Sequence, residues 1–299
     1  MSEGNQKMAN QELVTVIIAS FNHAPYIEQS ILSVIEQTYP NVELLVIDDG
    51  STDNSVERIS ALQSVHGFDF RVQKNQGLTR TLNEAIARAK GAFIAPFGSD
   101  DIMLKDRLKM QMDYIADKPE VGMCAGNIEL MHADGTPYPK SATAQEPSFR
   151  RMDFEDVFLE RKPYVPAPTM LIRREALNKV GGFDPSIRLE DLYIQLKITH
   201  AGYYIDALGT ILARYRKHQT NSYKNIRFMT ESILRIYQDY ADHPAYEQVK
   251  FKFINSMLVK ASRRDRALAE ELIAQLPLRG WNRRTLASLL RYRFAPVSP

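Results

Sequence analysis

The sequence predicts an α/β fold with a mostly parallel sheet flanked by helices, and three apolar runs carry this prediction. Each run has the length of a buried strand, ends in polar residues and is followed by residues with helical spacing. Strands that alternate with helices in this way favour a parallel sheet with right-handed crossovers. The runs are residues 14–19, 42–47 and 92–97.

The first predicted strand, residues 14–19, is followed by polar residues that include Ser20 and Asn22. Isoleucine then recurs at every fourth position across residues 27–35, which is the spacing of one helix face. This strand and helix form the first unit of the predicted sheet. They place Ser20 and Asn22 where the strand ends, at the carboxyl edge of the sheet.

The second predicted strand, residues 42–47, ends in two adjacent aspartates, Asp48 and Asp49. A further strand is predicted at residues 70–74, and apolar residues with helical spacing follow it at residues 82–89. Open α/β sheets bind ligands outside the carboxyl ends of their strands. We therefore expect Asp49 to lie at a ligand-binding edge.

The third run, residues 92–97, leads into a second pair of aspartates, Asp100 and Asp101. An unpaired charge at the end of a buried strand is costly, and carboxylate oxygens suit Mg²⁺ or Mn²⁺ held together with substrate phosphates. The alternative is that an aspartate caps a helix, which we expect at residues 102–116. The repeated arrival of carboxylates at strand ends favours one nucleotide site over separate helix caps.

The composition is that of an ordinary soluble enzyme, with 44% hydrophobic and 25% charged residues in a chain of 299. The single cysteine, Cys124, excludes an internal disulfide, and its apolar surroundings predict a buried structural thiol. Residues 1–11 are polar and lack the apolar core of a signal peptide. No stretch approaches the roughly 20 apolar residues that cross a bilayer.

Basic residues concentrate in residues 258–299, which hold nine Lys and Arg against three acids. This stretch carries a charge of +6, so the rest of the chain carries −4 of the net +2. Trp281 and several leucines interleave with the last arginines, and a basic amphipathic segment of this kind can lie on an anionic membrane surface. The alternative is a solvated helical face. No nucleic-acid motif accompanies the charge, so no nucleic-acid partner is expected.

The pattern along the chain predicts a leader, an α/β domain and a basic helical region. A proline-rich stretch at residues 132–168 reads as loop within the α/β domain. Apolar residues with helical spacing begin again near residue 223. The expected divisions are a flexible leader at 1–12, an α/β domain at 13–222 with halves at 13–130 and 131–222, and the helical region at 223–299.

A set of short motifs gives the chain a resemblance to a known family. The matching segments are residues 16–22, 33–39, 48–53, 75–78, 98–101, 181–184, 190–191 and 215–218. Their order and spacing resemble the family 2 glycosyltransferases, which have the GT-A fold with a Rossmann-like sheet. The resemblance covers roughly residues 13–222. Many members have Asp where this chain has Gly98, so the first carboxylate of the usual D-x-D pattern is missing, which leaves Asp100 and Asp101.

The resemblance implies a nucleoside-diphosphate sugar donor of the UDP or dTDP type. The resemblance implies that the Asp49 carboxylate accepts a hydrogen bond from the base. Uracil and thymine present the same N–H and carbonyl groups, so Asp49 does not distinguish UDP from dTDP. A divalent metal, Mn²⁺ or Mg²⁺, is implied as the cofactor. The implied ligands of this metal are Asp100, Asp101 and His218, although a lone histidine such as His218 is more often structural. The residues implied in donor nucleotide binding are Ser20, Asn22, Asp49, Asn75 and Asp100.

The resemblance also places the catalytic base at Asp191, which follows Glu190 and precedes a helical stretch. A base there would deprotonate an acceptor hydroxyl, whose oxygen would attack the anomeric carbon opposite the diphosphate and invert it. The alternative is an acid that stabilises the first turn of a helix. Gly181 and Gly182 are expected in a tight turn, where glycine permits either a close backbone approach or positive φ; the alternative is a plain loop. Asn83 either lies near the donor or satisfies backbone groups.

The implied acceptor is a glycan or lipid-linked sugar in cell-surface polysaccharide or lipopolysaccharide synthesis. We expect a cytoplasmic protein, peripheral on the inner face of the cytoplasmic membrane through its basic C-terminal region. The transferred sugar stays open between rhamnose, a hexose and an N-acetylhexosamine.

Three other classes compete with this interpretation. A dehydrogenase needs G-x-G-x-x-G after the first strand, which is absent. A sugar nucleotidyltransferase usually has a glycine-rich phosphate loop there, and residues 20–24 do not form one. A non-catalytic nucleotide-sugar-binding module finds its best support in Gly98. Retention of Asp100, Asp101 and Asp191 argues against such a module.

Overall fold

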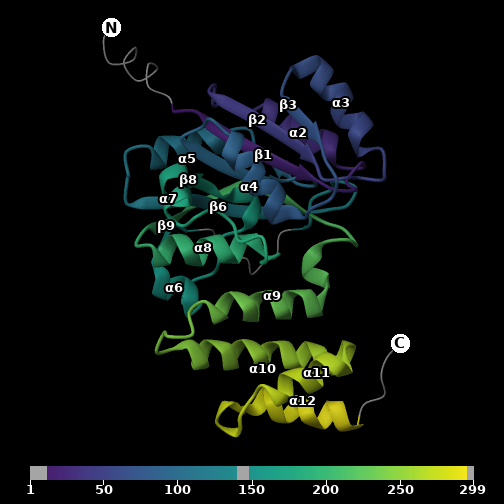
Figure 1. Ribbon diagram of the computed structural model, residues 1–299, viewed down its shortest axis with the longest axis vertical. Helices are drawn as coiled ribbons and strands as arrows, with labels where there is room; N and C mark the ends of the chain where they lie inside the picture. The colour runs from purple at the N-terminus through teal and green to yellow at the C-terminus, as the bar shows by residue number, and fades with distance from the viewer. Residues whose placement is uncertain (1–11, 140–147, 295–299) are drawn as a thin grey trace. The chain divides into compact units, whose positions relative to one another are not determined.

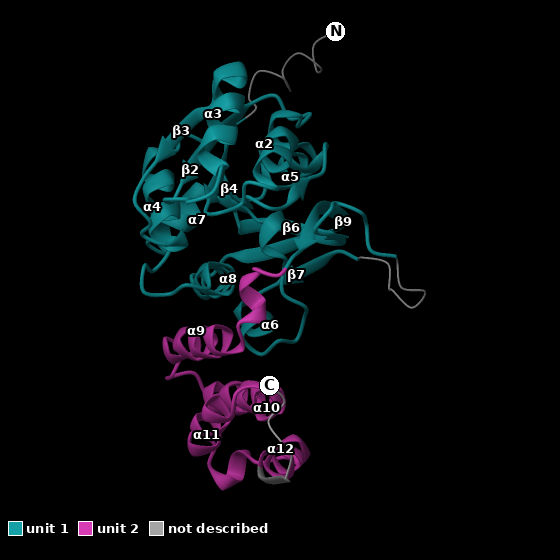
Figure 2. Ribbon diagram, turned by 90° about the vertical axis from the view of Figure 1, so that its right-hand side faces the viewer, with its two compact units in different colours: residues 1–218 teal, residues 219–299 magenta. Residues whose placement is uncertain are grey.

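The protein is represented by a computed structural model that describes residues 12–139 and 148–294 (Figure 1). The chain divides into two compact units, residues 1–218 and residues 219–299, which Figure 2 shows in teal and magenta. Apart from Glu12, the leader expected at residues 1–12 lies outside the described residues.

Unit 1 has the α/β fold that the sequence predicts, and its sheet is mixed, with both parallel and antiparallel pairs. In chain order the strands are β1 (Val14–Ser20), β2 (Val42–Asp48), β3 (Asp69–Val72), β4 (Phe93–Gly98), β5 (Ile102–Met103), β6 (Val121–His132), β7 (Arg150–Met152), β8 (Leu171–Arg173) and β9 (Tyr204–Lys217). Their order across the sheet is β3-β2-β1-β4-β8-β6-β9-β5, and β7 pairs with β9.

Helices cover both faces of this sheet. They are α2 (Ile27–Ile35), α3 (Ser55–His66), α4 (Leu78–Arg88), α5 (Arg107–Ile115), α6 (Phe154–Phe158), α7 (Arg174–Lys179) and α8 (Glu190–His200), with a 3₁₀ turn η1 (Ala167–Thr169). Alternate residues of a strand point to opposite faces. Val16 and Ile18 of β1 therefore share one core with Ile31 of α2 and Leu108 of α5, and Ile17 is buried outside that core.

The strands β3, β2, β1 and β4 are mutually parallel, and their register brings the polar strand ends together. Ser20 pairs with Asp48, and Ala19 pairs with Gly98. The prediction that these strands end at one edge is confirmed. Their parallel pairing in matched register aligns these ends, and β1 and β4 are apolar runs of the kind that is typical of strands buried on both faces.

The prediction of a helix at residues 102–116 is wrong for its first five residues, 102–106. Ile102 and Met103 form β5, which pairs antiparallel with β9, and α5 begins only at Arg107. The backbone N–H of Met103 also donates to Ser33 Oγ at 3.0 Å. The aspartates before β5 therefore stand between two strands, so neither of them caps a helix.

The proline-rich stretch is more structured than the loop that the sequence predicts. It contains β7, α6 and η1, while residues 140–147 lie outside the described part. The α6 helix begins with a capping box, in which Asp153 accepts from the backbone N–H of Asp156 at 2.9 Å. This local hydrogen bonding explains why a short helix forms among prolines.

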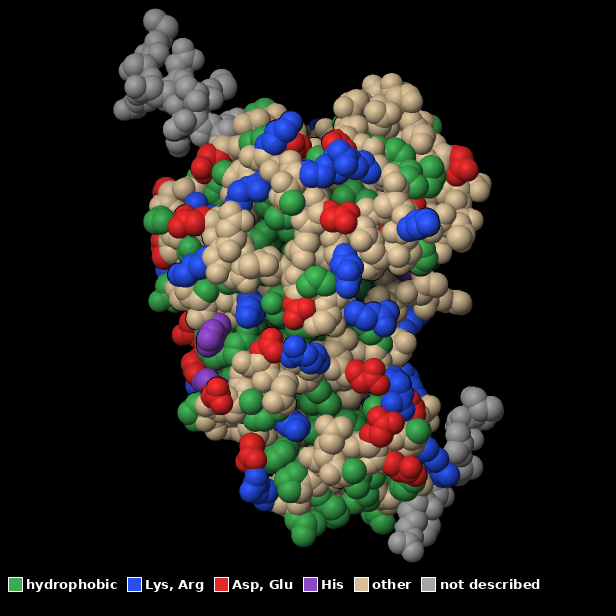
Figure 3. Space-filling view, viewed as in Figure 1, with side chains coloured by type: hydrophobic (Ala, Val, Ile, Leu, Met, Phe, Trp, Pro, Cys, Tyr) green, Lys and Arg blue, Asp and Glu red, His purple; other side chains and the backbone are tan. Residues whose placement is uncertain are grey.

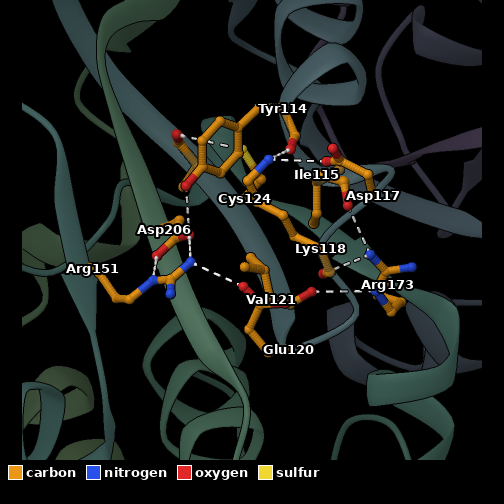
Figure 4. Close-up of polar contacts among 11 residues, drawn as sticks. Tyr114, Ile115, Asp117, Lys118, Glu120, Val121, Cys124, Arg151, Arg173 and Asp206 are labelled. Atoms are coloured by element: carbon orange, nitrogen blue, oxygen red, sulfur yellow. Dashed lines mark hydrogen bonds and ion pairs between the residues drawn. The ribbon is translucent and has the colours of Figure 1, made fainter.

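A buried carboxylate on β9 ties three elements together (Figure 4). Asp206 is fully buried, accepts two hydrogen bonds from Arg151 of β7 at 2.7 and 2.9 Å, and accepts one from the Tyr114 hydroxyl of α5 at 2.7 Å. Removing one partner of such a buried pair leaves an uncompensated charge. The network therefore fixes β9, the strand that ends beside the site described below.

Unit 2 is helical, as predicted for the C-terminal region. Its helices are α9 (Ile226–Gln238), α10 (Tyr246–Arg264), α11 (Arg266–Ala274) and α12 (Arg283–Phe294), with 3₁₀ turns η2 (Ser222–Lys224) and η3 (Leu278–Gly280). Asn255 of α10 bonds to the Thr285 hydroxyl of α12 and to Gly280 O. None of the described helices has the length and apolar character that crossing a membrane requires.

Candidate active site

The ends of β1, β4 and β9 bring together a cluster of three possible metal ligands. His23, Asp100 and His218 each offer one ligand atom, and these atoms lie within 4.8 Å of one another. His218 Nε2 is 2.8 Å from Asp100 Oδ2. Asp100 and His218 were expected here from the sequence, and His23 was not.

The backbone around Asp100 is held by neighbouring elements. The Ser30 hydroxyl of α2 donates to Gly98 O at 2.7 Å, and Arg216 Nε donates to Asp100 O at 2.7 Å. The Asp100 side chain keeps 14% of its surface exposed, whereas that of His218 keeps 5%. Asp100 therefore remains accessible to a ligand from the solvent side.

Arg216 of β9 holds together several groups around the site. Besides Asp100 O, its guanidinium donates to Ala133 O at 3.0 Å and to Gln29 Oε1 at 2.7 Å, and it lies 4.9 Å from the centre of the Tyr26 ring. A planar guanidinium can serve several acceptors and one ring at once, which lysine cannot. Arg216 lies in the matching segment 215–218, but the sequence predicts no role for it, because that role depends on contacts far apart in the chain.

Asp101 is placed differently from Asp100. It is buried, and its Oδ1 accepts from the backbone N–H of Arg216 at 2.9 Å. Burial, together with the charge of Asp100, raises the pKa of Asp101 well above its usual value. The metal-ligand role expected for Asp101 stays a prediction, and within the described residues only its Oδ2 accepts no hydrogen bond.

Gly98 stands against both aspartates. A Cβ atom there would lie 2.8 Å from Asp100 Oδ1 and 2.9 Å from Asp101 Oδ2. Contacts this short force a neighbour to move, and both carboxylates are already held, by His218 and by Arg216 respectively. The absence of a side chain at Gly98 therefore leaves space for the observed positions of the Asp100 and Asp101 carboxylates.

Asp49 lies at the same sheet edge but is largely occupied by the protein. Its carboxylate accepts from Gln73 Nε2 at 2.8 Å, from Gln76 N at 3.0 Å and from Gly77 N at 2.9 Å. A carboxylate has about four lone-pair positions, so about one remains. The loop containing Asn75 is thereby fastened to β2.

Ser20 and Asn22 follow β1, as expected. The Ser20 hydroxyl is buried and has no hydrogen-bond partner among the described residues. Asn22 has a φ of 53°, and its side chain accepts from Thr52 N at 2.8 Å. A non-glycine residue in this backbone region is strained, and such strain concentrates at functional sites.

Glu190 and Asp191 form the first turn of α8. Desolvation and the charge of Asp191 raise the pKa of Glu190 to about 8, and desolvation also raises the pKa of Asp191. Asp191 Oδ1 accepts from Leu192 N at 2.7 Å. Asp191 is not among the possible metal ligands that cluster in the described part of the chain. A carboxyl with a raised pKa is suited to general base catalysis near neutral pH.

The turn before α8 confirms two details of the sequence analysis. Gly181 and Gly182 have φ values of 80° and 75°, and a Cβ on Gly182 would meet Asn83 Oδ1 at 2.9 Å. Asn83 bonds to both backbone groups of Phe183, donating to its O at 2.6 Å and accepting from its N at 3.0 Å. Of the two roles considered for Asn83, the structure shows the backbone one.

Solved structures show which fold this chain shares. A mannosyltransferase of Pyrobaculum calidifontis, solved with GDP-Man and Mn²⁺, has a TM-score of 0.64 at 18% identity, covering 95% of this chain and 86% of that one. TarS of S. aureus, solved with UDP-GlcNAc, has a TM-score of 0.61 at 18% identity, covering 83% and 72%. The fold is that of the GT-A glycosyltransferases.

Sequence relatives identify the family. The profile described as Glycosyl transferase family 2 matches residues 15–181. TuaG of Bacillus subtilis, assigned to teichuronic acid biosynthesis, is 30% identical over 210 residues, covering 68% of this chain and 79% of its own. The Escherichia coli glucosyltransferase WfgD is 28% identical over 239 residues, covering 75% and 90%. The chain belongs to glycosyltransferase family 2.

Proposed function

We propose that this glycosyltransferase moves a sugar from a nucleoside-diphosphate sugar to a hydroxyl of a glycan or lipid-linked acceptor in cell-surface polysaccharide synthesis. The observation that carries this proposal is the placement of Asp100 and His218 beside each other at the carboxyl edge of the sheet. The names of two relatives support the acceptor class. TuaG is named for teichuronic acid biosynthesis, and WfgD for transfer from UDP-Glc to a diphosphoundecaprenol-linked sugar.

The donor set of the site fits a divalent metal. Asp100 supplies a partly exposed carboxylate, and His218 supplies an imidazole whose Nε2 faces it. Asp101 would contribute through Oδ2, since Arg216 occupies Oδ1. Bound there, Mn²⁺ or Mg²⁺ would neutralise the diphosphate leaving group. The chain's own part is to hold these ligands in place through Arg216 and the backbone of β4.

The nucleotide would bind over the ends of β1 and β2. The remaining acceptor position of Asp49 suits the N–H of a pyrimidine base, which favours a UDP or dTDP donor. The unpartnered Ser20 hydroxyl would gain a hydrogen bond from a ligand that reached it. Asn22 and Asn75 border the same edge, and Asp100 would hold the ribose.

Asp191 would act as the catalytic base. Burial raises the pKa of Asp191, and a carboxylate with a raised pKa is a stronger base toward a hydroxyl proton once it is ionised. It would take the proton of the acceptor hydroxyl, whose oxygen then attacks the anomeric carbon while the bond to the diphosphate breaks. A single displacement of this kind inverts the anomeric centre.

We also propose that the protein works at a membrane surface, through α12. This helix buries its small polar residues, Thr285 and Ser288, and exposes 54% of Leu286 and 61% of Leu290. The pattern is the reverse of an ordinary surface helix, whose apolar stripe faces the core. Hydrophobic side chains gather at the lower end of Figure 3, where Figure 1 shows α12.

The charge around these leucines indicates what covers them. Arg283, Arg284 and Arg291 are exposed and form no ion pair within the described ranges. Arginines beside exposed leucines complement a bilayer that carries anionic lipid. Two copies packed face to face would bring like charges together. The membrane therefore fits this surface better than self-association.

Donor hydrolysis tests the proposed activity without knowledge of the acceptor. UDP-Glc, UDP-GlcNAc, dTDP-rhamnose and GDP-Man would be incubated with the protein, with Mn²⁺ or with EDTA, and nucleotide release would be measured. The proposal expects metal-dependent release from one donor, lost in Asp100→Ala. A protein that binds a donor but releases no nucleotide, even with wild-type cell extract as a source of acceptor, would instead be a non-catalytic binding module.

A further inference from the structure

We infer that His23 is a further ligand of the divalent metal, so that the site presents two imidazole nitrogens and the Asp100 carboxylate. This inference rests on the metal site of the proposed function, and it extends that site to a residue from a different strand end. The observation behind it is the approach of the ligand atoms of His23, Asp100 and His218 to within 4.8 Å of one another.

The hydrogen bonding of His23 leaves one ring nitrogen for a metal. Its Nδ1 lies 2.7 Å from the hydroxyl of Ser99, which is buried. With Nδ1 donating to Ser99, Nε2 carries the lone pair of the neutral imidazole. Metal-binding histidines commonly have their second nitrogen held in this way, which fixes both the tautomer and the orientation of the ring.

The position of His23 is set before any ligand binds. Its backbone N–H donates to the Ser55 hydroxyl at 3.2 Å, and the next residue, Ala24, donates to Asp53 at 2.9 Å. Its ring meets that of His218 edge to face, with the centroids 5.5 Å apart. Two imidazoles thus lie close to the Asp100 carboxylate, and a cation bound there would use all three groups.

The nitrogen-rich set has a consequence for the choice of metal. The affinity of such a site rises from Mn²⁺ through Co²⁺ to Ni²⁺, and imidazole also suits Zn²⁺, whereas Mg²⁺ prefers oxygen ligands and keeps several of its waters. A site built from Asp100 and Asp101 alone would bind Mg²⁺ and Mn²⁺ through oxygen. Adding His23 to His218 shifts the preference toward transition metals, so Mg²⁺ should compete poorly for this site.

Cobalt titration tests the role of His23 by a readout that does not depend on activity. Co²⁺ would be added to the full-length protein with UDP present, and its visible absorption band would give both affinity and ligand environment. His23→Asn is the informative variant, because its amide can bond to Ser99 as Nδ1 does but does not reach the position of Nε2. His66→Ala removes an exposed histidine at the far end of α3 and serves as the control.

The inference expects His23→Asn to lower Co²⁺ affinity at least about tenfold and to shift the absorption band, while Mg²⁺ binding, measured by calorimetry, changes less. His66→Ala should match the wild type. An unchanged Co²⁺ affinity and band in His23→Asn, with binding lost in Asp100→Ala, would overturn the role of His23 and leave the metal site of the proposed function intact. Wild-type Co²⁺ binding in Asp100→Ala would overturn both.

Discussion

The Asp100 carboxylate and the His218 imidazole lie 2.8 Å apart, although 118 positions separate them in the sequence. Asp100 follows β4, which pairs parallel with β1, and His218 follows β9, which pairs parallel with β6 and antiparallel with β5. Arg216 of β9 links the two strand ends. Its guanidinium donates to Asp100 O, and its backbone N–H donates to the Asp101 carboxylate. The two halves of the sheet therefore meet at this pair, and the following predictions depend on it.

Restoring the acid that many family members have should damage the site. In Gly98→Asp, the new Cβ would crowd Asp100 Oδ1 at 2.8 Å and would add a third negative charge beside two carboxylates. We expect Mn²⁺ affinity, measured by calorimetry with UDP present, to fall at least about tenfold. Gly98→Ala tests the steric part alone and should show a smaller loss. Tighter Mn²⁺ binding in Gly98→Asp would contradict this interpretation of Gly98.

The Glu190 and Asp191 pair should give the reaction a rate that rises with pH. The base must be unprotonated, and the pKa of Glu190 is raised from 4.5 to about 8 with that of Asp191 also raised, so protonation of the pair suppresses the rate in this range. In Glu190→Gln the group that titrates near pH 8 is removed, so the part of the rise in donor hydrolysis near that pH should disappear. Asp191→Asn should abolish turnover at every pH while donor binding survives. A pH profile that does not move in Glu190→Gln would be evidence against the coupling.

The same pair makes a prediction about stability that needs no substrate. A carboxyl whose pKa is raised in the folded state binds its proton more tightly there than in the unfolded chain. The free energy of unfolding contributed by Glu190 is therefore greatest at low pH and is lost as pH rises from 4.5 through about 8. Urea unfolding of Glu190→Gln across this range should show a weaker decline with pH than the wild type. Parallel curves for the two proteins would count against the raised pKa.

Asp49 should matter for folding as well as for the nucleotide. Asp49→Asn replaces a charged acceptor of three hydrogen bonds from the loop at residues 73–77. We expect a loss of about 1.5–3 kcal/mol in the free energy of unfolding, measured in urea. Asp113→Asn is the control, because Asp113 is an exposed acid with a surface ion pair to Lys109 and should cost little. Equal stabilities of the two variants would argue against a fastening role for Asp49.

The leucines of α12 should govern binding to anionic lipid. Vesicle sedimentation of Leu286→Ser/Leu290→Ser should show at least about tenfold weaker binding to phosphatidylcholine vesicles containing phosphatidylglycerol, since each leucine buries apolar surface in the bilayer. Val65→Ser, at an exposed valine of α3, should bind like the wild type. Wild-type protein that stays in the supernatant, or that dimerises through α12 instead, would remove the membrane proposal.

The parallel half of the fold was the part most open to prediction from the sequence. Strands buried on both faces appear as uninterrupted apolar runs, so residues 14–19, 42–47 and 92–97 coincide closely with β1, β2 and β4. The two-residue strand β5 is too short to carry any period, and the helical spacing after it extended the predicted helix backwards over it. Its pairing with β9 is a long-range contact that no local sequence pattern predicts.

The residues of the candidate site likewise fall into two groups: those that a local motif predicts and those that only tertiary contacts place. Asp100, Asp49 and Asp191 stand in recognisable motifs, whereas His23 is a single histidine in a loop without a ligand at metal-binding spacing. The difference between Asp100 and Asp101 also depends on tertiary structure, because only the register of β9 brings the N–H of Arg216 to Asp101. Adjacent aspartates in the sequence therefore have different surroundings in the fold.

The central claim is a metal-dependent nucleotide site centred on Asp100, and calorimetry tests it most directly. UDP, dTDP and GDP would each be titrated into wild type and Asp100→Ala, with Mn²⁺ and with EDTA. The account predicts tight binding of UDP or dTDP that requires Mn²⁺ and is lost in Asp100→Ala while the variant keeps its thermal midpoint. Failure of every nucleotide to bind wild type with Mn²⁺, or equal binding with EDTA and in Asp100→Ala, would contradict it.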